Sequence, residues 1–441
     1  MNPVTVIGAG LAGCEAALQL ARRGVAVRLV EMRPGTMTPA HRTGEVAELV
    51  CSNSLKSDEP HNAHGLLKAE LRLYGSVLLE CAARSRVPGG KALVVDRERF
   101  SAEVAAALAG AGIEIERGEL RELPDGVIVV ASGPLTSDPL AESLARELGA
   151  EQLFFFDAIA PVVSADSVDR AVAFAGSRYG AGSDYLNCPL DEAQYRRFVD
   201  ELARAEPHPV HGFERGMLFE GCLPVEELAR RGPDTLAFGP MKPVGLLSPD
   251  RGHDPGSGDR SGSCPRPHAV VQLRQENAAG TMFNLVGFQT RLRQSEQRRV
   301  FRLIPGLARA EFLRYGAMHR NSYLDAPRVL EPTLQARSRP DLFVAGQLTG
   351  VEGYVESIGA GLVAGVNAAR ACQGEEALAW PAETMLGGLL RYIGTGPADA
   401  RFQPMNANFG LLPPVAVKKH QRRELMVERA LAAAREFAVR D

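Results

Sequence analysis

The chain lacks the features that mark membrane-spanning, secreted and metal-binding proteins. Its longest apolar runs fall well short of the roughly 20 residues that a transmembrane helix needs, and no basic leader opens it. We therefore expect a cytoplasmic protein without membrane contact. Its cysteines form no CxxC pair, which gives no support to zinc ribbons or thioredoxin-like redox motifs, and no metal site is expected. We expect seven reduced thiols, at positions 14, 51, 81, 188, 222, 264 and 372.

The chain also lacks a dominant charge. Lys and Arg total 50 and Asp and Glu total 53, so the formal net charge is −3. This balance argues against a histone-like binder, but it leaves local nucleic-acid contact open because an average hides charged patches. The composition that remains, 45% hydrophobic and 23% charged, is typical of a globular protein. With 441 residues and about 150 residues per domain, two or three domains are expected.

The N-terminus carries a strand–helix–strand pattern. Residues 4–7 form a β-branched run that predicts a buried strand, and an Ala- and Leu-rich segment at 11–23 predicts a helix that ends before Gly24. Residues 25–30 predict a second strand, which ends at Glu31. Such a βαβ unit generates a parallel sheet.

A glycine-rich turn joins the first strand to the helix. Its GxGxxG spacing suits a dinucleotide: Gly8 permits the tight turn, Gly10 lets the backbone approach a pyrophosphate, and Gly13 allows close packing of helix and strand. The helix N-terminus then offers free N–H groups to phosphates. Glu31 is positioned to accept ribose hydroxyls. The predicted cofactor-binding residues of this turn are Gly8, Ala9, Gly10, Leu11, Ala12 and Gly13.

A second glycine cluster near the C-terminus favours FAD over NAD. A late strand at 342–345 ends in Ala-Gly-Gln, and a glycine-rich helix start follows at 349–354. This arrangement suits a long cofactor that runs across the sheet to a second helix N-terminus, whereas NAD usually needs only the first cluster. Residues 127–133 supply a possible third glycine turn. The cofactor contacts predicted from this second cluster are Gly346, Gln347, Gly350 and Glu352.

The pattern changes between about residues 150 and 325, where short strands and many turns replace the βα order. We interpret this stretch as an inserted domain. The expected fold class is α/β: a Rossmann-like FAD-binding domain, similar to glutathione reductase, with an inserted α+β domain. The expected division is 1–92 for the first part of the FAD-binding domain, 93–326 for a mixed segment that is largely a substrate or RNA domain, and 327–441 for the second part with C-terminal helices. Clustered Gly, Pro and Ser at 248–268 predict an exposed loop.

Several segments are specific enough to resemble a known family. The stretch from Leu342 to Ser357, LFVAGQLTGVEGYVES, is similar to two families of FAD-binding tRNA-uridine modification proteins. One is the wobble-uridine carboxymethylaminomethyl family, whose members carry a further helical domain of about 200 residues that this chain does not show. The other is the folate- and FAD-dependent tRNA uracil-C5 methyltransferase family. Resemblance to the second spans nearly the whole chain, with further matching segments at 51–57, 220–226, 239–246 and 321–327.

The resemblance implies a reaction and its participants. It implies methylation of C5 of uridine 54 in the T-loop of tRNA, with 5,10-methylenetetrahydrofolate as carbon donor and reduced FAD as hydride source. NAD(P)H is expected to reduce the flavin, so the expected partners are tRNA and folate, with no obligate protein partner. Two other functions stay open at this point: an FAD oxidoreductase acting on a small molecule, and a flavin-carrying tRNA-binding protein without catalysis.

Two cysteines match what this chemistry requires. C5 of uracil is a poor nucleophile until a thiolate adds to C6, and a base must later remove the C5 proton. Cys222 lies just before Pro224 and a predicted helix N-terminus, a setting that favours thiolate. Cys51 lies in a long polar loop after the first βαβ unit. We assign Cys222 as the C6 nucleophile and Cys51 as its partner, although the sequence by itself also allows the reverse.

Two short basic runs are candidates for contact with tRNA phosphates. The first holds five arginines against one glutamate, Glu296, and the second, at 415–423, holds two lysines and two arginines. A solvated helix face is the competing interpretation of each run. The predicted RNA-binding residues are Arg291, Arg293, Arg298, Arg299, Lys418 and Lys419.

Overall fold

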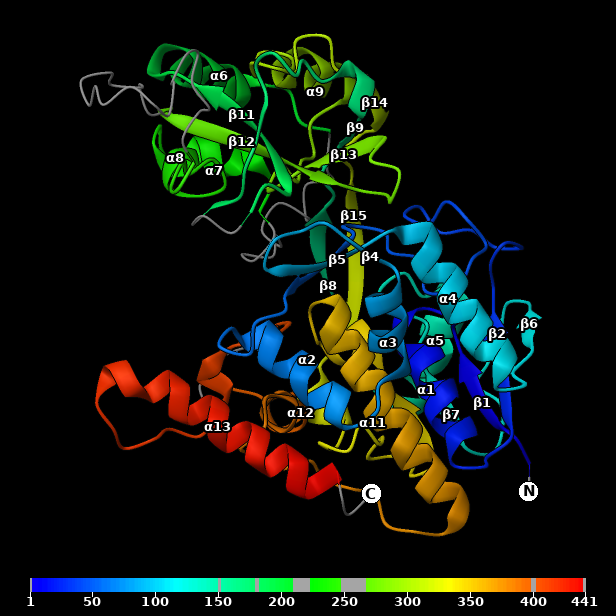
Figure 1. Ribbon diagram of the computed structural model, residues 1–441. Helices are drawn as coiled ribbons and strands as arrows, with labels where there is room; N and C mark the ends of the chain where they lie inside the picture. Colours follow the sequence, from blue (N-terminus) through cyan, green and yellow to red (C-terminus); the bar gives the residue numbers. More distant parts are fainter. Residues whose placement is uncertain are drawn as a thin grey trace.

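The computed structural model describes residues 2–149, 152–178, 182–208, 223–246, 267–397 and 402–438. They form two lobes joined by a two-stranded ribbon (Figure 1). The main lobe comprises the described residues up to 149 and from 325 onward. The inserted lobe comprises the described residues between 159 and 316. No helix in these described ranges is long and apolar enough to cross a membrane.

A five-stranded parallel sheet forms the centre of the main lobe, in the order β16-β7-β1-β2-β6. This confirms the parallel sheet that the N-terminal βαβ pattern predicted. The chain first builds outward from β1 to β2 and later returns to the other side of β1, so the strand order reverses there. Cofactors of open α/β sheets bind beyond the carboxyl ends of the strands at such a reversal. The strands are β1 (Val4–Ile7), β2 (Val27–Glu31), β6 (Ile115–Arg117), β7 (Ile128–Val130) and β16 (Leu342–Val344).

Two helices pack against each other beside this sheet, α1 (Leu11–Arg22) and α11 (Tyr354–Gln373). Glycines of α11 allow the close approach. A Cβ atom at Gly361 would lie 2.2 Å from the carbonyl oxygen of Ala12, and one at Gly365 would lie 2.6 Å from that of Ala16. Any larger residue at these positions would push the two helices apart, and with them the cofactor turns that precede both helices.

The remaining helices of the main lobe surround this pair. A single helix is expected over 63–84, but the structure divides it at Gly75, whose φ is +73°, and Ser76 caps the second helix. The buried carboxylate of Glu15 accepts the N–H groups of Val77 and Leu78, which fixes that break. The helices are α2 (Ala63–Leu73), α3 (Val77–Arg84), α4 (Arg97–Gly110), α5 (Asp138–Leu148), α10 (Ala326–Val329), α12 (Met385–Thr395) and α13 (Lys419–Ala438).

A small three-stranded sheet and a ribbon lead to the inserted lobe. The small sheet has the order β3-β5-β4, and β8 pairs with β15 in an antiparallel ribbon that runs between the lobes (Figure 1). The register of the ribbon places Asp157 opposite His319. The strands are β3 (Ser54–Ser57), β4 (Arg86–Val87), β5 (Ala92–Val95), β8 (Gln152–Ala158) and β15 (Met318–Leu324).

The inserted lobe is a six-stranded antiparallel sheet in the order β10-β11-β12-β13-β9-β14, with helices around it and its own core. Aromatic rings fill that core: Phe288 lies 6.1 Å from Phe198 and 5.6 Å from Phe301 between ring centroids. Most of the loop expected at 248–268 lies outside the described residues. The elements are β9 (Val162–Ser164), β10 (Phe174–Ala175), β11 (Tyr185–Leu190), β12 (Ala269–Gln275), β13 (Met282–Leu285), β14 (Phe312–Arg314), α6 (Glu192–Arg204), α7 (Val225–Arg231), α8 (Thr235–Phe238) and α9 (Gln294–Phe301).

Candidate active site

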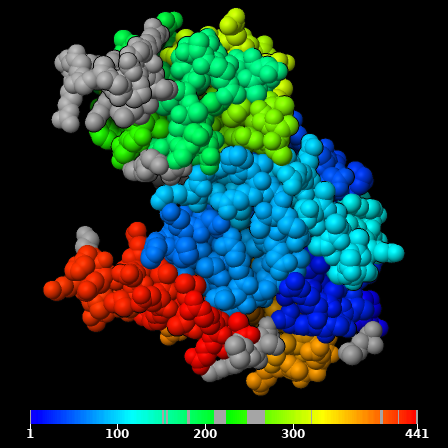
Figure 2. Space-filling view, viewed as in Figure 1, coloured from blue at the N-terminus to red at the C-terminus, as the bar shows by residue number. Residues whose placement is uncertain are grey.

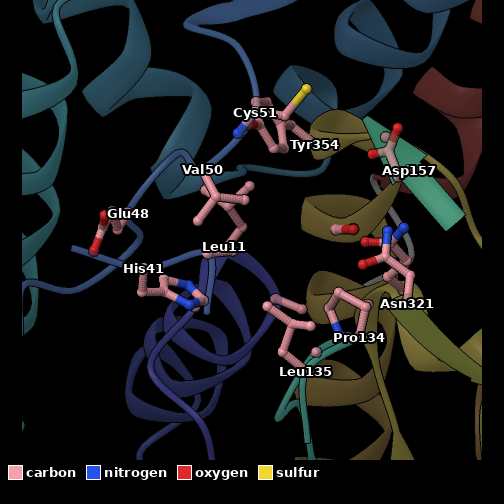
Figure 3. A pocket seen from close by; sticks show the side chains of 18 of the residues that line it. Leu11, His41, Glu48, Val50, Cys51, Pro134, Leu135, Asp157, Asn321 and Tyr354 are labelled. Carbon is pink, nitrogen blue, oxygen red and sulfur yellow. The ribbon is translucent and has the colours of Figure 1, made fainter. Parts of the chain in front are cut away.

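A cavity of about 380 Å³ lies at the carboxyl ends of the parallel strands (Figure 3). The segments that follow β1, β2, β7 and β16 all line it, and so do both strands of the ribbon. Segments far apart in the sequence therefore meet here. In Figure 3, Cys51 and Tyr354 lie together, apart from Pro134 and Leu135 of the turn after β7.

The glycines of the first turn have different structural roles. A Cβ at Gly13 would lie 1.8 Å from the carbonyl oxygen of Gly8, and one at Gly8 would lie 2.6 Å from that of Ala131, so both positions are filled by backbone. A Cβ at Gly10 would meet no protein atom within 4 Å. Gly10 lines the cavity, and so it presents bare backbone to whatever the cavity holds.

Both helices that begin at the cavity lack a side-chain cap. Gly10 precedes α1 and Gly353 precedes α11, and neither position supplies a side-chain acceptor. A side chain at the N-cap accepts a backbone N–H in α2, α3, α4, α6 and α12 but not in α5, α7 or α9. What distinguishes α1 and α11 is that their uncapped first residues line the cavity. The first N–H groups of α1 and α11 are thus left for a ligand, and the positive end of each helix dipole favours phosphate. These features fit an extended dinucleotide such as FAD.

Glu31 is held as a carboxylate at the end of β2. It accepts the N–H of Ala9 at 2.8 Å and pairs with the buried Arg33 at 2.9 Å. Burial by itself would raise the pKa of Glu31, but the bonds from Arg33 and Ala9 outweigh it and lower the pKa. Arg33 also pairs with Glu48 at 3.1 Å. An ionised Glu31 that lines the cavity is positioned to accept the hydroxyls of a ribose.

The start of α11 brings two further acids to the cavity. Glu352 accepts a hydrogen bond from Gln347 at 2.6 Å, and burial together with Asp157 raises its pKa to about 8. Glu356 lies one turn further and bonds His64 at 3.0 Å. Its burial would raise its pKa, but His64 and nearby positive charge lower the pKa to about 2. At neutral pH, one face of the cavity therefore presents a protonated acid at Glu352 and a carboxylate at Glu356.

Cys51 lies at the same cavity, half-buried. The hydroxyl of Tyr354 accepts the N–H groups of Cys51 and Ser52 at 2.8 and 3.1 Å, and the Cys51 Sγ lies 4.0 Å from the carbonyl oxygen of Ala158. Burial raises the pKa of Tyr354, which keeps its hydroxyl protonated. The residue that starts α11 thus fixes the backbone at Cys51.

Three arginines surround the backbone of the Cys51 loop. Arg97 forms a 2.7 Å ion pair with Glu276 and donates to the Cys51 carbonyl at 3.3 Å. Arg314 donates to the same carbonyl at 3.4 Å, and burial lowers its pKa to about 10. Arg274 bonds the next two residues of the loop. Arg97 belongs to the main lobe and the other two to the inserted lobe, so this loop is where the lobes meet.

Cys222, the predicted nucleophile, lies outside the described residues. The chain resumes at Leu223, and α7 begins at Val225 directly after Pro224, as the sequence predicted. The N–H of Val225 donates to the carbonyl of Gln289 at 2.7 Å, and Gln289 lines the cavity. The segment that follows Cys222 is therefore anchored beside the cavity wall.

Most of the predicted cofactor residues line the cavity, and three do not. Ala9 instead bonds Glu31, Gly13 packs on Gly8, and Gly350 turns at a φ of +86° against the ring of Phe402. Those that line the cavity are Gly8, Gly10, Leu11, Ala12, Glu31, Gly346, Gln347 and Glu352.

Several lining residues were not predicted from the sequence. Tyr354 lies inside the family motif from Leu342 to Ser357, and its position in that motif could have indicated a place at the site. Asn321 of the ribbon likewise opens the matching segment 321–327. No motif included Asp157, Arg274, Gln289 or His319, since their cavity position depends on how distant segments pack. The unpredicted residues include Arg33, His41, Glu48, Asp157, Arg274, Gln289, His319, Asn321 and Tyr354.

The first basic run is largely paired with acids. Arg291 pairs with Glu227, Arg293 with Glu206 at 3.1 Å, and Arg299 with both Glu201 and Glu296. These pairs reduce the local charge that the linear sequence suggested. Arg298 differs, because it contacts the Tyr315 hydroxyl and ring. In the second run Lys418 is exposed, and the side chain of Lys419 lies outside what the structure describes.

Comparison with known proteins gives consistent matches. Residues 3–376 match the family model described as "Glucose inhibited division protein A". The chain is 56% identical over 436 residues to the methylenetetrahydrofolate–tRNA-(uracil-5-)-methyltransferase TrmFO of Moorella thermoacetica, covering 98% of this chain and 97% of that protein. It is 55% identical over 435 residues to the protein of the same name from Geobacter sulfurreducens, covering 97% of each.

Among solved structures, GidA of Aquifex aeolicus is similar, with a TM-score of 0.71 at 16% identity. The match covers 99% of this chain and 73% of that one. A likeness at this identity concerns the fold, and it confirms the Rossmann-like α/β architecture with an inserted lobe.

Proposed function

The chain belongs to the TrmFO family of methylenetetrahydrofolate–tRNA-(uracil-5-)-methyltransferases, and from that premise we propose that it methylates C5 of uridine 54 in the T-loop of tRNA. The observation that carries this proposal is the position of Cys51. A family motif with a thiol lines the same cavity as the glycine turns that suit FAD. A thiolate at that place is suited to the uracil chemistry, which needs a base or a nucleophile at the ring.

The main lobe holds the cofactor through its backbone. Gly8, Gly10 and Gly346 line the phosphate path, the uncapped N-termini of α1 and α11 face it, and Glu31 receives the ribose. When bound, the reduced flavin supplies the hydride that converts the methylene unit from methylenetetrahydrofolate into a methyl group. We propose NAD(P)H as the source of its electrons.

Two thiols act on the uracil ring. The thiolate of Cys222 adds to C6, which moves the C5–C6 π electrons toward O4 and makes C5 nucleophilic. After the one-carbon unit has joined C5, the thiolate of Cys51 removes the C5 proton and becomes a thiol. The released electron pair re-forms the C5–C6 double bond as the Cys222 sulfur leaves as a thiolate. Tyr354 supports this role because it fixes the backbone of Cys51 through two hydrogen bonds. The ring faces must be accessible, so the uridine leaves its stack in the T-loop.

The shape of the surface supports an RNA partner. Figure 2 shows a broad hollow between the inserted lobe, in green, and α13, in red, with the region around α2, in blue, at its floor. The N-terminal end of α13 follows Lys418 and carries Arg422 and Arg423. We propose that this basic end of α13 and Arg298 on the inserted lobe contact RNA phosphates.

Methyl transfer to defined RNA tests the proposal. Purified protein with FAD, NADPH and methylenetetrahydrofolate carrying a labelled carbon is incubated with a tRNA transcript, and with a matched transcript that has cytidine at position 54. Label is expected in the first RNA only. Label in neither RNA overturns the proposed function, and equal label in both overturns the assignment of position 54. Flavin oxidation by folate without labelled RNA favours a small-molecule oxidoreductase.

A further inference from the structure

The cavity is lined by a buried cation that forms no ion pair of its own among the described residues. Arg274, on β12, is 8% exposed and lines the cavity beside the Cys51 loop. Its Nε donates to Asn53 Oδ1 at 3.0 Å, and its Nη2 donates to Ser52 Oγ at 2.7 Å. Both acceptors are neutral, so the guanidinium makes no ion pair there.

The surroundings of Arg274 have an excess of positive charge. Glu276 is the acid that acts on it, and Arg97 already pairs with that acid at 2.7 Å. Arg314 adds a third guanidinium close by, which bonds backbone carbonyls of the same loop. Three cations thus share one carboxylate. Buried charge without a counter-ion is costly, so this region is suited to a negative charge that arrives with a ligand or develops during reaction.

One nitrogen of Arg274 is left for that negative charge. Nε and Nη2 make all the hydrogen bonds of this side chain to the part of the chain that the structure describes, and Nη1 makes none. Nη1 is also not among the fully buried side-chain atoms that lack a hydrogen-bond partner, so the described residues do not enclose it. A guanidinium with two nitrogens fixed and a third open is a preorganised donor, because its direction is set before the ligand enters.

The chemistry of the proposed function supplies an anion at this place. When a thiolate adds to C6 of uracil, the sulfur–carbon bond forms and the C5–C6 π pair moves to give an enolate, with its negative charge on O4. O4 is attached to the carbon next to C5. A base at Cys51 must reach the C5 proton, which brings O4 toward the residues that flank Cys51. Ser52, the next residue, is bonded to Arg274.

We propose that Arg274 is a catalytic residue whose Nη1 donates a hydrogen bond to O4 of the target uracil and stabilises the enolate formed by thiolate addition. This assignment rests on the proposed uracil methylation. The charge on O4 disappears again when C5 attacks the one-carbon unit and the C4 carbonyl re-forms. The guanidinium therefore acts mainly on the transition states for forming and consuming the enolate, and contributes little to the affinity for RNA.

A substitution of the substrate oxygen tests this contact directly. Short T-loop RNAs are made with uridine or 4-thiouridine at the target position, so that sulfur, a weaker acceptor, replaces O4. Single-turnover methylation at saturating RNA is then measured for the wild type and Arg274→Gln, which forms a double-substitution cycle across the proposed contact. Arg274→Gln should slow the uridine reaction by roughly 10²- to 10³-fold and the 4-thiouridine reaction by less than about 10-fold. RNA affinity and the flavin absorbance spectrum should stay unchanged.

Further variants separate catalysis from positioning of the loop. Ser52→Ala removes the 2.7 Å tie to the loop and keeps the guanidinium, so it should not reproduce the loss caused by Arg274→Gln. Arg274→Lys keeps the charge and should give intermediate rates, and the same cycle is run on it if the Gln variant does not fold. Arg196→Gln, which removes an exposed arginine paired with Asp234 in the same lobe, serves as the matched control.

The possible outcomes are distinct. Equal penalties on uridine and 4-thiouridine RNA overturn the O4 contact. A Ser52→Ala loss as large as that of Arg274→Gln means that Arg274 only positions the loop, which also overturns the proposal. A wild type that methylates neither RNA, nor a tRNA transcript, overturns the proposed function itself. A penalty confined to uridine RNA supports Arg274 as the donor to O4.

Discussion

The main lobe and the inserted lobe contribute to one cavity in different ways. The main lobe contributes mostly backbone: glycine turns at strand ends and two helix N-termini without side-chain caps. The inserted lobe contributes single side chains, such as Arg274 from β12. A cofactor that is bound throughout the catalytic cycle suits a site built from backbone. Charge that appears only during reaction suits side chains placed by tertiary packing.

The Cys51 loop is where the two contributions meet. Asn53 donates from the main lobe to the carbonyl of Gln275 at 2.9 Å, and Arg97 pairs with Glu276. Arg274 reaches back to the loop from the inserted lobe. The same residues therefore hold the lobes together and shape the cavity. Variants that change one lobe and leave the other intact can separate the backbone contribution of the main lobe from the side-chain contribution of the inserted lobe.

The largest effect is expected from the proposed nucleophile. Cys222→Ala should lower methyl transfer by roughly 10³-fold or more, and should prevent a covalent adduct with RNA that carries 5-fluorouridine at the target position. The protein should still purify with yellow flavin, because the proposed cofactor contacts belong to the main lobe. Gel analysis of the adduct and the flavin spectrum check both points. Cys188→Ala, which changes a buried cysteine of the inserted lobe, is the control. An adduct that persists in Cys222→Ala would contradict the assignment.

Substitutions at two neighbouring glycines of the main lobe should have different effects, one on stability and the other on FAD affinity. Gly13→Ala places a Cβ against the carbonyl of Gly8, and it should lower the free energy of unfolding by roughly 3 kcal/mol or more. Gly10→Ala meets no protein atom, so the flavin-free protein should stay within about 1 kcal/mol of the wild type. Its FAD affinity should still fall at least about tenfold, because the methyl group occupies the phosphate path.

Urea unfolding of the flavin-free protein and fluorescence titration with FAD measure these two effects. An equal loss of stability in both variants would mean that the open space at Gly10 is not what distinguishes them.

Two buried glutamates, Glu356 in the main lobe and Glu226 in the inserted lobe, should give opposite dependences of stability on pH. The pKa of Glu356 in the main lobe is lowered to about 2, so its contribution is present above its usual pKa of 4.5 and is lost as pH falls toward 2. Complete loss of this contribution would lower the free energy of unfolding by about 3 kcal/mol. Burial raises the pKa of Glu226 in the inserted lobe, so its contribution is present below 4.5 and is lost as pH rises through the folded pKa.

Unfolding measured from pH 3 to pH 8 checks this prediction. Glu356→Gln should flatten the acid side of the stability profile, and Glu226→Gln should flatten the decline toward neutral pH. The same change of slope in both variants would contradict the opposite signs expected for Glu356 and Glu226.

The smallest expected effects concern RNA phosphates. Arg299 is engaged by Glu201 and Glu296, whereas Arg298 contacts only Tyr315 among the described residues. Arg298→Gln and Lys418→Gln should each reduce the slope of log affinity against log salt by roughly 0.7 to 0.9, with a few-fold loss of tRNA affinity at low salt. Arg299→Gln should change the slope little. Filter binding at several salt concentrations gives these slopes, and a larger effect at Arg299 would reverse the ranking.

The sequence predicted the main lobe better than the inserted lobe for a physical reason. Glycine turns, caps and strand periodicity are local, so Gly8, Gly10 and Glu31 could be placed by the residues around them. The break at Gly75 was missed because a buried carboxylate from α1, Glu15, stabilises it. The sequence around Arg299 shows the cationic residues of the first basic run, but it does not show that α6 places Glu201 beside them.

The sequence by itself determined the N-terminal βαβ unit, the glycine turn within it, the second glycine cluster and the two cysteine motifs, because each depends on residues that lie close together in the chain. Only the tertiary structure decided which residues share a cavity. Tyr354 reaches Cys51 across 303 positions, and Arg274 reaches Asn53 across 221. Such contacts follow from the packing of α11 on α1 and from the ribbon that joins the lobes, and no local pattern encodes them. At the first basic run, too, only the tertiary structure shows that acids from neighbouring elements pair with the arginines.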